Sequence, residues 1–240
     1  MRLSLIIPMY NESSVIEQSA QTLQNALDRD FGKENYELLF VDDGSKDGCS
    51  QLIRSDEEHQ VRVIRYEENR GKGYAVRMGM LAANGDIVMF TDADLAYGTE
   101  VVLRAAEMLC KQTDADVLVG SRNLKKDGYE GYSFFRKVAS KAYIRVLCMI
   151  GGLKLSDSQC GCKAFRKDAA QKIFSNCEVD RFAFDFEAIL WAQKFGYHFI
   201  EMPVKVINHR ESTVHVFKDS FRMLHDLRKM KKRIRKAIIE

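Results

Sequence analysis

Residues 86–95 read DIVMFTDADL, an apolar run that ends on two aspartates, Asp92 and Asp94. A short apolar run bounded by polar residues is typical of a strand that is buried on both faces of a sheet. We therefore predict a strand over 86–94 that carries both carboxylates at its carboxyl end. The alternative for the pair is an aspartate-rich turn or a helix cap.

Outward from this run, strand and helix patterns alternate along the first half of the chain. Further buried strands are predicted over 3–8, 36–43, 61–66 and 115–122. Helical periodicity and capping residues predict helices over 15–27, 49–58, 73–84 and 99–112. Strands that alternate with helices build right-handed βαβ units. We therefore expect an α/β fold with a mostly parallel central sheet, helices on both faces, and ligands bound beyond the carboxyl ends of the strands.

The second half of the chain is less regular. Helices are predicted over 132–153, 165–173 and 185–195, a loop over 157–163, and a strand pair or one bent strand over 198–207. A basic amphipathic helix is predicted over 217–239. We accordingly divide the chain into a main domain, 1–215, and a C-terminal helix, 216–240.

Composition excludes several classes of protein. A chain of 240 residues, 46% of them hydrophobic, suffices for one large domain. Its 37 basic and 34 acidic residues give a net charge of only +3, so nucleic acid is not an expected partner. The sequence has no signal peptide and no run that approaches the roughly 18 apolar residues that span a bilayer, which predicts a cytoplasmic protein. The six cysteines form no C-x-x-C pair and are expected to be free thiols.

Carboxylates at the predicted strand ends point to nucleotide chemistry. Asp92 and Asp94 could share Mg²⁺ or Mn²⁺, which proteins hold with one or two carboxylates together with substrate phosphates. Such a metal would stabilise a diphosphate leaving group. In FVDDGSKDG, residues 40–48, Asp42 and Asp43 could accept the N–H groups of uracil or guanine. A helix N-cap is the alternative for this second pair.

Two further segments complete the expected nucleotide site. In IPMYNE, residues 7–12, two apolar walls and two polar contacts would surround the base: Pro8, Tyr10, Asn11 and Glu12. In NRGKGYA, residues 69–75, two glycines open a predicted helix. Its backbone amides and positive end suit a phosphate, and Lys72 would add charge. A simple turn is the alternative for this segment.

In this order and spacing, IPMYNE, VDDGSKDG, NRGKGYAVRMGM and TDADL resemble the inverting glycosyltransferases of family 2, which have the GT-A fold. The resemblance covers about the first half of the chain. In the second half, DSQCGCKAF (157–165), FDFE (184–187) and NHRESTV (208–214) are similar to polyprenyl-phosphate glycosyltransferases, above all dolichyl-phosphate β-glucosyltransferases.

This resemblance implies metal-dependent transfer of a hexose from a nucleotide sugar, UDP-glucose first, to dolichyl or undecaprenyl phosphate, with inversion. GDP-mannose as donor and a non-lipid glycan as acceptor are the alternatives, and a nucleotide-binding regulator is a distant third. Mannose synthases often carry a glutamine where this chain has Ala96, which weakens the GDP-mannose alternative.

The resemblance also implies a role for each matching residue. The acceptor phosphate would be held by Arg122, Arg136 and Ser140. The base and metal residues would be joined around the donor by Lys72, Gln159, Lys163, Arg210 and Ser212. The residues closest to the reaction would be Asp92, Asp94, Arg122, Arg136 and Asp185. Asp185 would orient the acceptor or a sugar hydroxyl, with a charge at a helix start as the alternative.

The predicted terminal helix suggests a membrane surface or a membrane-anchored protein as partner. Lys and Arg predominate between 218 and 236, and a helically spaced apolar stripe is formed by Met223, Leu227, Met230, Ile234 and Ile238. This pattern is typical of an interfacial helix on anionic lipid, and equally of a helix docked on the domain with its basic face in solvent. Residues 142–155 are a second candidate for membrane contact, with a packed core helix as the alternative. We expect peripheral attachment at the cytoplasmic face of a membrane.

Overall fold

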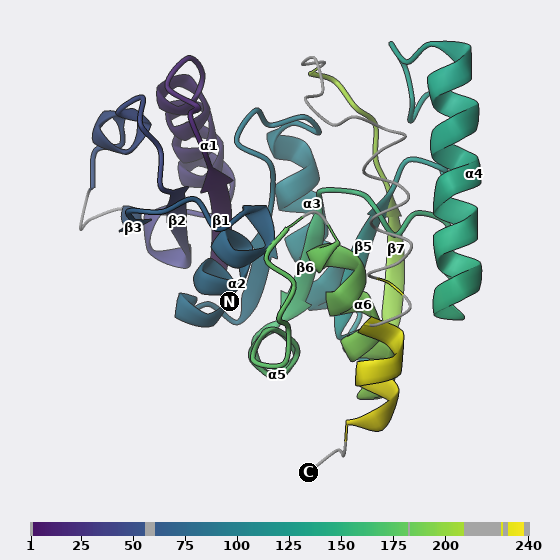
Figure 1. Ribbon diagram of the computed structural model, residues 1–240. Helices are drawn as coiled ribbons and strands as arrows, with labels where there is room; N and C mark the ends of the chain where they lie inside the picture. The colour runs from purple at the N-terminus through teal and green to yellow at the C-terminus, as the bar shows by residue number, and fades with distance from the viewer. Residues whose placement is uncertain (1, 56–60, 182, 209–226, 228–229, 238–240) are drawn as a thin grey trace.

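The computed structural model describes residues 2–55, 61–181, 183–208, 227 and 230–237 (Figure 1). Its strands are β1 (Leu3–Met9), β2 (Tyr36–Asp43), β3 (Val61–Tyr66), β4 (Ile87–Phe90), β5 (Val117–Ser121), β6 (Lys163–Arg166) and β7 (Phe199–Pro203). The helices are α1 (Ile16–Asp30), α2 (Lys72–Ala82), α3 (Thr99–Lys111), α4 (Phe134–Gly151), α5 (Lys167–Phe174) and α6 (Phe184–Lys194). Two short 3₁₀ helices are η1 (Lys33–Asn35) and η2 (Cys49–Leu52).

The seven strands form one mostly parallel sheet in the order β3-β2-β1-β4-β6-β5-β7. Every residue of β1, β2, β4 and β5 is buried, as expected for strands covered on both faces. One hydrophobic core lies between the sheet and helices α1 and α3, and the other between the sheet and helices α2, α5 and α6. The predicted α/β architecture is therefore confirmed.

Strand β6 departs from the prediction. It pairs antiparallel with β4 on one side and with β5 on the other. The sequence predicted a helix over 165–173, whereas the chain is extended to Arg166 and turns helical only at Lys167. A four-residue strand has no periodicity of its own, so the pairing with its two neighbours decides its conformation.

Two other predicted elements are shorter than expected. The helix predicted over 49–58 is wrong beyond Leu52, because residues 53–55 are not helical; 56–60 lie outside the described residues. The strand predicted over 86–94 ends at Phe90, and the chain then turns. The amide of Leu95 donates to the carbonyl of Asp92 at 3.0 Å, and Leu95 has a φ of 49°. Asp92 and Asp94 thus lie in a tight turn directly after the strand, and their predicted role in binding a metal stays a prediction.

The described part of the C-terminal helix is docked on the domain. Leu227, Met230 and Ile234 are buried in the core that contains α6. Arg233 forms ion pairs with Glu178 and Glu187. This part of the apolar stripe therefore faces protein, as in the second of the two interpretations, a helix docked on the domain. Met223, Ile238, Arg210, Ser212 and the predicted boundary at 215–216 lie outside the described residues.

Helix α4 begins and ends on clear capping signals. The Ser133 hydroxyl accepts a hydrogen bond from the Arg136 amide at 3.3 Å, and Gly152 closes the helix in the left-handed conformation at φ 71°. Figure 1 shows α4 at the margin of the molecule. No helix within the described ranges has the length and hydropathy that a membrane span requires.

Candidate active site

The turn after β4 lies against the loop that precedes β6. A Cβ atom on Gly161 would lie 3.1 Å from Asp92 Cγ, so the loop backbone sits directly on this carboxylate. The Gly161 amide donates to the Tyr97 hydroxyl at 3.3 Å. The motifs TDADL and QCGCK, 65 residues apart in sequence when measured from Asp94 to Gln159, thus form one structure. Gly161 was not predicted as a site residue, although its place between two cysteines marked the loop.

Lys72 supplies the positive charge of this structure. It is the first residue of α2, and its ammonium group bonds to Asp92 Oδ1. Burial lowers the pKa of Lys72, but the charge of Asp92, the hydrogen bond to it and the charges of Asp185 and Asp94 together outweigh burial, and the net pKa is raised. Lys72 therefore lies beside the aspartate pair, and its predicted contact with a phosphate stays a prediction.

Asp94 is held by the turn itself and by the segment after β7. The amide of Ala96 donates to Asp94 Oδ1 at 3.1 Å. The side-chain amide of Asn208 donates to the Asp94 carbonyl at 3.1 Å. Burial and then the charge of Asp92 raise the pKa of the Asp94 carboxyl. A carboxyl group whose ionisation is disfavoured by a neighbouring carboxylate suits a site for a hard cation, whose charge would remove the repulsion.

No group of three or more His, Cys, Asp or Glu side chains in the described ranges is placed to hold a metal by itself. The pair Asp92 and Asp94 would therefore need substrate phosphates to complete the ligand set, which is the usual way Mg²⁺ is bound.

A second polar cluster links the loop to α6. Asp185 Oδ1 accepts from Gln159 Nε2 at 3.1 Å, and its Oδ2 accepts from Lys163 Nζ at 3.3 Å. The Lys163 side chain is fully buried, and its ammonium also donates to the Cys160 carbonyl at 2.7 Å. Three residues predicted from two separate motifs therefore form one network. In it, Asp185 holds the two loop residues in place.

The two aspartates at the end of β2 have different surroundings. Asp43 accepts from the Tyr66 hydroxyl, the Asn69 side chain and the amides of Arg70 and Gly71, all at 2.7–2.9 Å. This carboxylate therefore ties β2 to the start of α2, and its predicted contact with a base stays a prediction.

Asp42 is fully buried but accepts fewer hydrogen bonds than Asp43. Its Oδ1 accepts from the Ser45 amide at 2.9 Å. Its Oδ2 has no hydrogen bond in the described part of the chain and lies 3.5 Å from Arg65 Nε. A buried carboxylate oxygen without a donor suits the N–H group of a base better than the saturated Asp43 does.

The segment after β1 lies beside this end of the sheet. Pro8 is buried inside β1, and Tyr10 is 45% exposed just beyond it. Asn11 has a φ of 54°, a conformation that few residues other than glycine adopt, and its side-chain oxygen accepts from the Lys46 amide at 3.0 Å. Loops after β1 and β2 are thereby joined. The base-binding roles of Pro8, Tyr10, Asn11 and Glu12 stay predictions.

Arg122, at the end of β5, forms its hydrogen bonds inside the protein. It is only 8% exposed, and its Nε and Nη2 atoms donate to the two oxygens of buried Asp157 at 2.7 and 3.0 Å. Bidentate pairing of this kind leaves little of the guanidinium for a ligand. Asp157 was quoted in a motif but not predicted as its partner, because no local signal joins residues 35 positions apart.

Aromatic rings connect Arg122 to the predicted acceptor residues on α4. The Arg122 guanidinium lies 5.2 Å from the ring centre of Tyr129, which is 5.6 Å from that of Tyr132. The Arg136 guanidinium lies 4.3 Å from the Tyr132 ring, and it belongs to an exposed residue. Ser140 lies next to the Tyr129 hydroxyl. Arg136 and Ser140 therefore share one neighbourhood, in which Arg136 and Lys141 are exposed cations.

All six cysteines are free, as predicted. Five are buried, and burial raises the pKa of the Cys160 thiol to about 11, so this thiol stays protonated in the loop that precedes β6.

Comparisons with known proteins identify the family of this chain. The chain matches Glycosyl transferase family 2 over residues 4–174. A dolichyl-phosphate beta-glucosyltransferase of Dictyostelium discoideum is 31% identical, over 94% of this chain and 72% of that protein. A protein of the same name from Drosophila melanogaster is 33% identical, over 85% of this chain and 67% of that protein.

Among solved structures, glucosyl-3-phosphoglycerate synthase of Mycobacterium tuberculosis in complex with UDP has a TM-score of 0.71 at 19% identity, covering 96% of this chain and 80% of that one. The same enzyme with Mn²⁺, UDP and glucosyl-3-phosphoglycerate has a TM-score of 0.64 at 18% identity, covering 97% of this chain and 77% of that one. At this level of identity the likeness concerns the fold, which is the GT-A fold that the resemblance implied.

Proposed function

Because this chain belongs to glycosyl transferase family 2, we propose that it moves glucose from UDP-glucose to a polyprenyl phosphate such as dolichyl phosphate, with inversion at the anomeric carbon. Transfer of a hexose from a nucleotide sugar follows from membership of this family. Glucose as the sugar rests on the named activity of the two relatives and on Ala96, which replaces the glutamine common in mannose synthases.

The contact between Gly161 and Asp92 is the observation that carries this proposal. It joins the turn expected to bind the sugar diphosphate to the loop whose sequence resembles the β-glucosyltransferases. Lys72 and the Asp185 network reach the same place from α2 and α6. Four separate motifs therefore meet around one volume beyond the carboxyl ends of β1 and β4.

The reaction needs positioning more than acid–base chemistry. An oxygen of the acceptor phosphate attacks the anomeric carbon, the bond from that carbon to the β-phosphate oxygen breaks, and UDP leaves with the electron pair. A phosphate is already anionic near neutral pH, so no side chain has to remove a proton from it. Asp185 then serves to hold Gln159 and Lys163, and the protein must bring two anions close together in line.

Cationic groups reduce the repulsion between these two anions. Lys72, now on Asp92, is placed to contact the diphosphate of the donor. Arg136, exposed at the start of α4, would bind the acceptor phosphate, which an arginine can hold with two parallel hydrogen bonds. A divalent cation held by Asp92 and Asp94, with Mn²⁺ and Mg²⁺ both suited to carboxylate ligands, would neutralise the leaving diphosphate.

A lipid acceptor requires the enzyme to work at a membrane surface. We place it on the cytoplasmic face, where free thiols such as the six cysteines persist.

Transfer of labelled sugar to a short polyprenyl phosphate tests the proposal, with UDP-glucose and GDP-mannose offered in parallel and Mn²⁺ or Mg²⁺ supplied. We expect glucolipid from UDP-glucose alone, lost on chelation and in Asp94→Ala. Mannolipid from GDP-mannose would overturn the choice of sugar. Binding of UDP without any lipid product would overturn the polyprenyl-phosphate acceptor.

A further inference from the structure

Helix α4 carries an apolar surface that no described part of the molecule covers. Five of its hydrophobic side chains are exposed, to between 43% and 83%: Phe134, Phe135, Val138, Val146 and Met149. At 100° per residue these positions fall within one stripe of about 120° along the helix. Its opposite side, with Ile144 and Leu147, is buried on the domain. Because α4 is apolar on both sides, we expect its exposed side to contact a second apolar environment besides the domain.

Charge around this stripe has a single sign. Residues 134–155 contain no acidic residue and five basic ones: Arg136, Lys137, Lys141, Arg145 and Lys154. On the helix, Lys141 and Arg145 border the exposed stripe or lie within it. Apolar side chains flanked by cations are the composition of helices that lie in the headgroup region of an anionic membrane.

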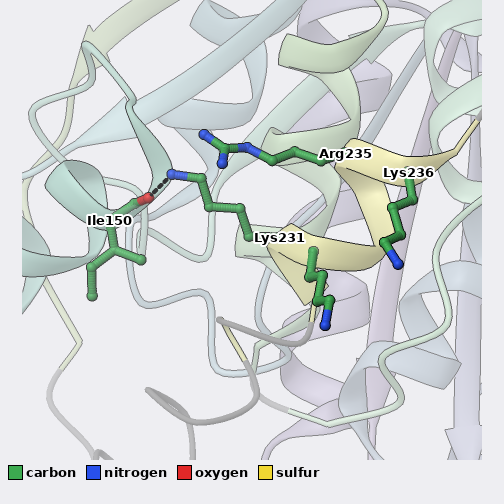
Figure 2. A pocket seen from close by; sticks show the side chains of 5 residues that line it. Ile150, Lys231, Arg235 and Lys236 are labelled. Atoms are coloured by element: carbon green, nitrogen blue, oxygen red, sulfur yellow. Dashed lines mark hydrogen bonds between the residues drawn. The ribbon is translucent and has the colours of Figure 1, made fainter.

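A basic pocket lies at the carboxyl end of α4. It is lined by Ile150 of α4 and by four cations of the C-terminal helix: Lys231, Lys232, Arg235 and Lys236. Figure 2 shows Lys231 reaching from the C-terminal helix to the Ile150 carbonyl, with Arg235 and Lys236 on the same helix. Residues 230–239 contain no acid either. Unlike Arg233, which is paired with Glu178 and Glu187, the four pocket cations have no ion pair with a described acidic residue.

We infer that the exposed stripe of α4 and this pocket together form a docking surface for an anionic lipid bilayer. The inference rests on the proposed function and deepens it, because Arg136, placed for the acceptor phosphate, lies on the same helix. The stripe enters the headgroup region while the pocket cations bind lipid phosphates. A second copy of the chain fits this surface less well, since two copies would bring like charges together.

Cosedimentation with vesicles tests the docking surface without relying on activity. Phe135→Ser combined with Met149→Ser removes two of the most exposed side chains and should weaken binding to vesicles of about 30% phosphatidylserine at least about tenfold. Lys232→Glu combined with Lys236→Glu should weaken it about fivefold or more per residue and reduce its dependence on salt. Leu52→Ser and Lys33→Glu, exposed residues on η2 and η1, are the matched controls and should bind as the parent does.

Further readouts separate this inference from the proposed function. Both double variants should retain turnover of a short, water-soluble polyprenyl phosphate and lose turnover of a long-chain acceptor in vesicles. Parent-like vesicle binding by both double variants would overturn the docking surface, whatever the activity. A shift of the Phe135→Ser, Met149→Ser variant to a smaller species in size-exclusion chromatography, with unchanged vesicle binding, would assign the stripe to self-association instead. Vesicle binding without any transferase activity would instead count against the proposed function alone.

Discussion

Replacing Gly161 with alanine should disable the site while leaving the fold nearly intact. The added Cβ would lie 3.1 Å from Asp92 Cγ and 3.3 Å from Oδ1. Its distance to Oδ2 would be shorter than 3.0 Å, and real Cβ atoms essentially never approach another atom that closely. Ordinary contact begins at 3.4 Å, so the loop or the carboxylate must move by about 0.5–1 Å. Gly161 does not have a positive φ, so the backbone itself accepts alanine.

A displacement of this size acts on alignment in the transition state. Misplacement of a reacting group by about 1 Å costs about 100-fold in rate, and we expect a fall of that order in kcat/KM for UDP-glucose. Affinity for Mn²⁺ in the presence of UDP, measured by calorimetry, should fall as well, because Asp92 is the residue displaced. The assay is steady-state transfer to a short polyprenyl phosphate.

Gly152→Ala is the matched control. Gly152 closes α4 with a φ of 71°, and a Cβ added there would meet no atom within 4 Å. Its replacement should lower the free energy of unfolding by about 1–2 kcal/mol, because alanine is strained in the left-handed conformation, and leave kcat/KM unchanged. If Gly161→Ala retained activity within about threefold of the parent, the position of Asp92 against the loop would not be what the reaction needs.

Three further changes probe the surrounding network. Asp157→Asn leaves the buried Arg122 without its bidentate partner and should cost about 3–5 kcal/mol of unfolding free energy in urea titrations; a loss below about 1 kcal/mol would contradict a buried pair. Lys72→Met should raise the KM for UDP-glucose about tenfold or more, because a charged hydrogen bond to phosphate is lost. Parent-like kinetics would show that Lys72 contacts Asp92 and not the donor phosphate. Burial raises the pKa of Glu187 from 4.5 to about 7, so the folded chain holds this proton more tightly than the unfolded chain. The associated stability is fully present below pH 4.5 and is lost as pH rises to about 7, by at most about 3 kcal/mol. Glu187→Gln should flatten this part of the pH profile in guanidinium titrations, and an unchanged slope would assign it to other groups.

Much of the site could be predicted because its motifs are local. Each polar cluster directly follows an apolar run, and parallel strands bring their carboxyl ends to one edge of the sheet. That topology brings Lys72, at the start of α2, close to Asp92 after β4. The contacts of Gln159 and Lys163 with Asp185 depend on antiparallel β6 and on α6, and the sequence did not predict them. Roles that depend on long-range partners could not be predicted in this way. Arg122 is an example, since two nitrogens of its guanidinium donate hydrogen bonds to Asp157.

The aspartates of β2 make the same distinction. Asp42 and Asp43 are adjacent and chemically identical, and the sequence treats them as one pair of base contacts. In the fold, successive side chains of a strand point to opposite sides, so they meet different neighbours. Asp43 is saturated by donors from the start of α2, whereas Asp42 keeps one oxygen without a donor among the described residues.

The sequence by itself determined the α/β alternation, the positions of most buried strands and the identity of the chemical groups at their ends. These features depend on apolar runs and turn residues within a few positions of one another. Only the tertiary structure decided that residues 163–166 are an antiparallel strand, that Gly161 lies on Asp92, and which apolar helix faces are covered. The described stripe of the C-terminal helix is buried, while the outer stripe of α4 is exposed. Periodicity alone is similar for the two helices, because burial depends on what packs against a face and not on the face itself.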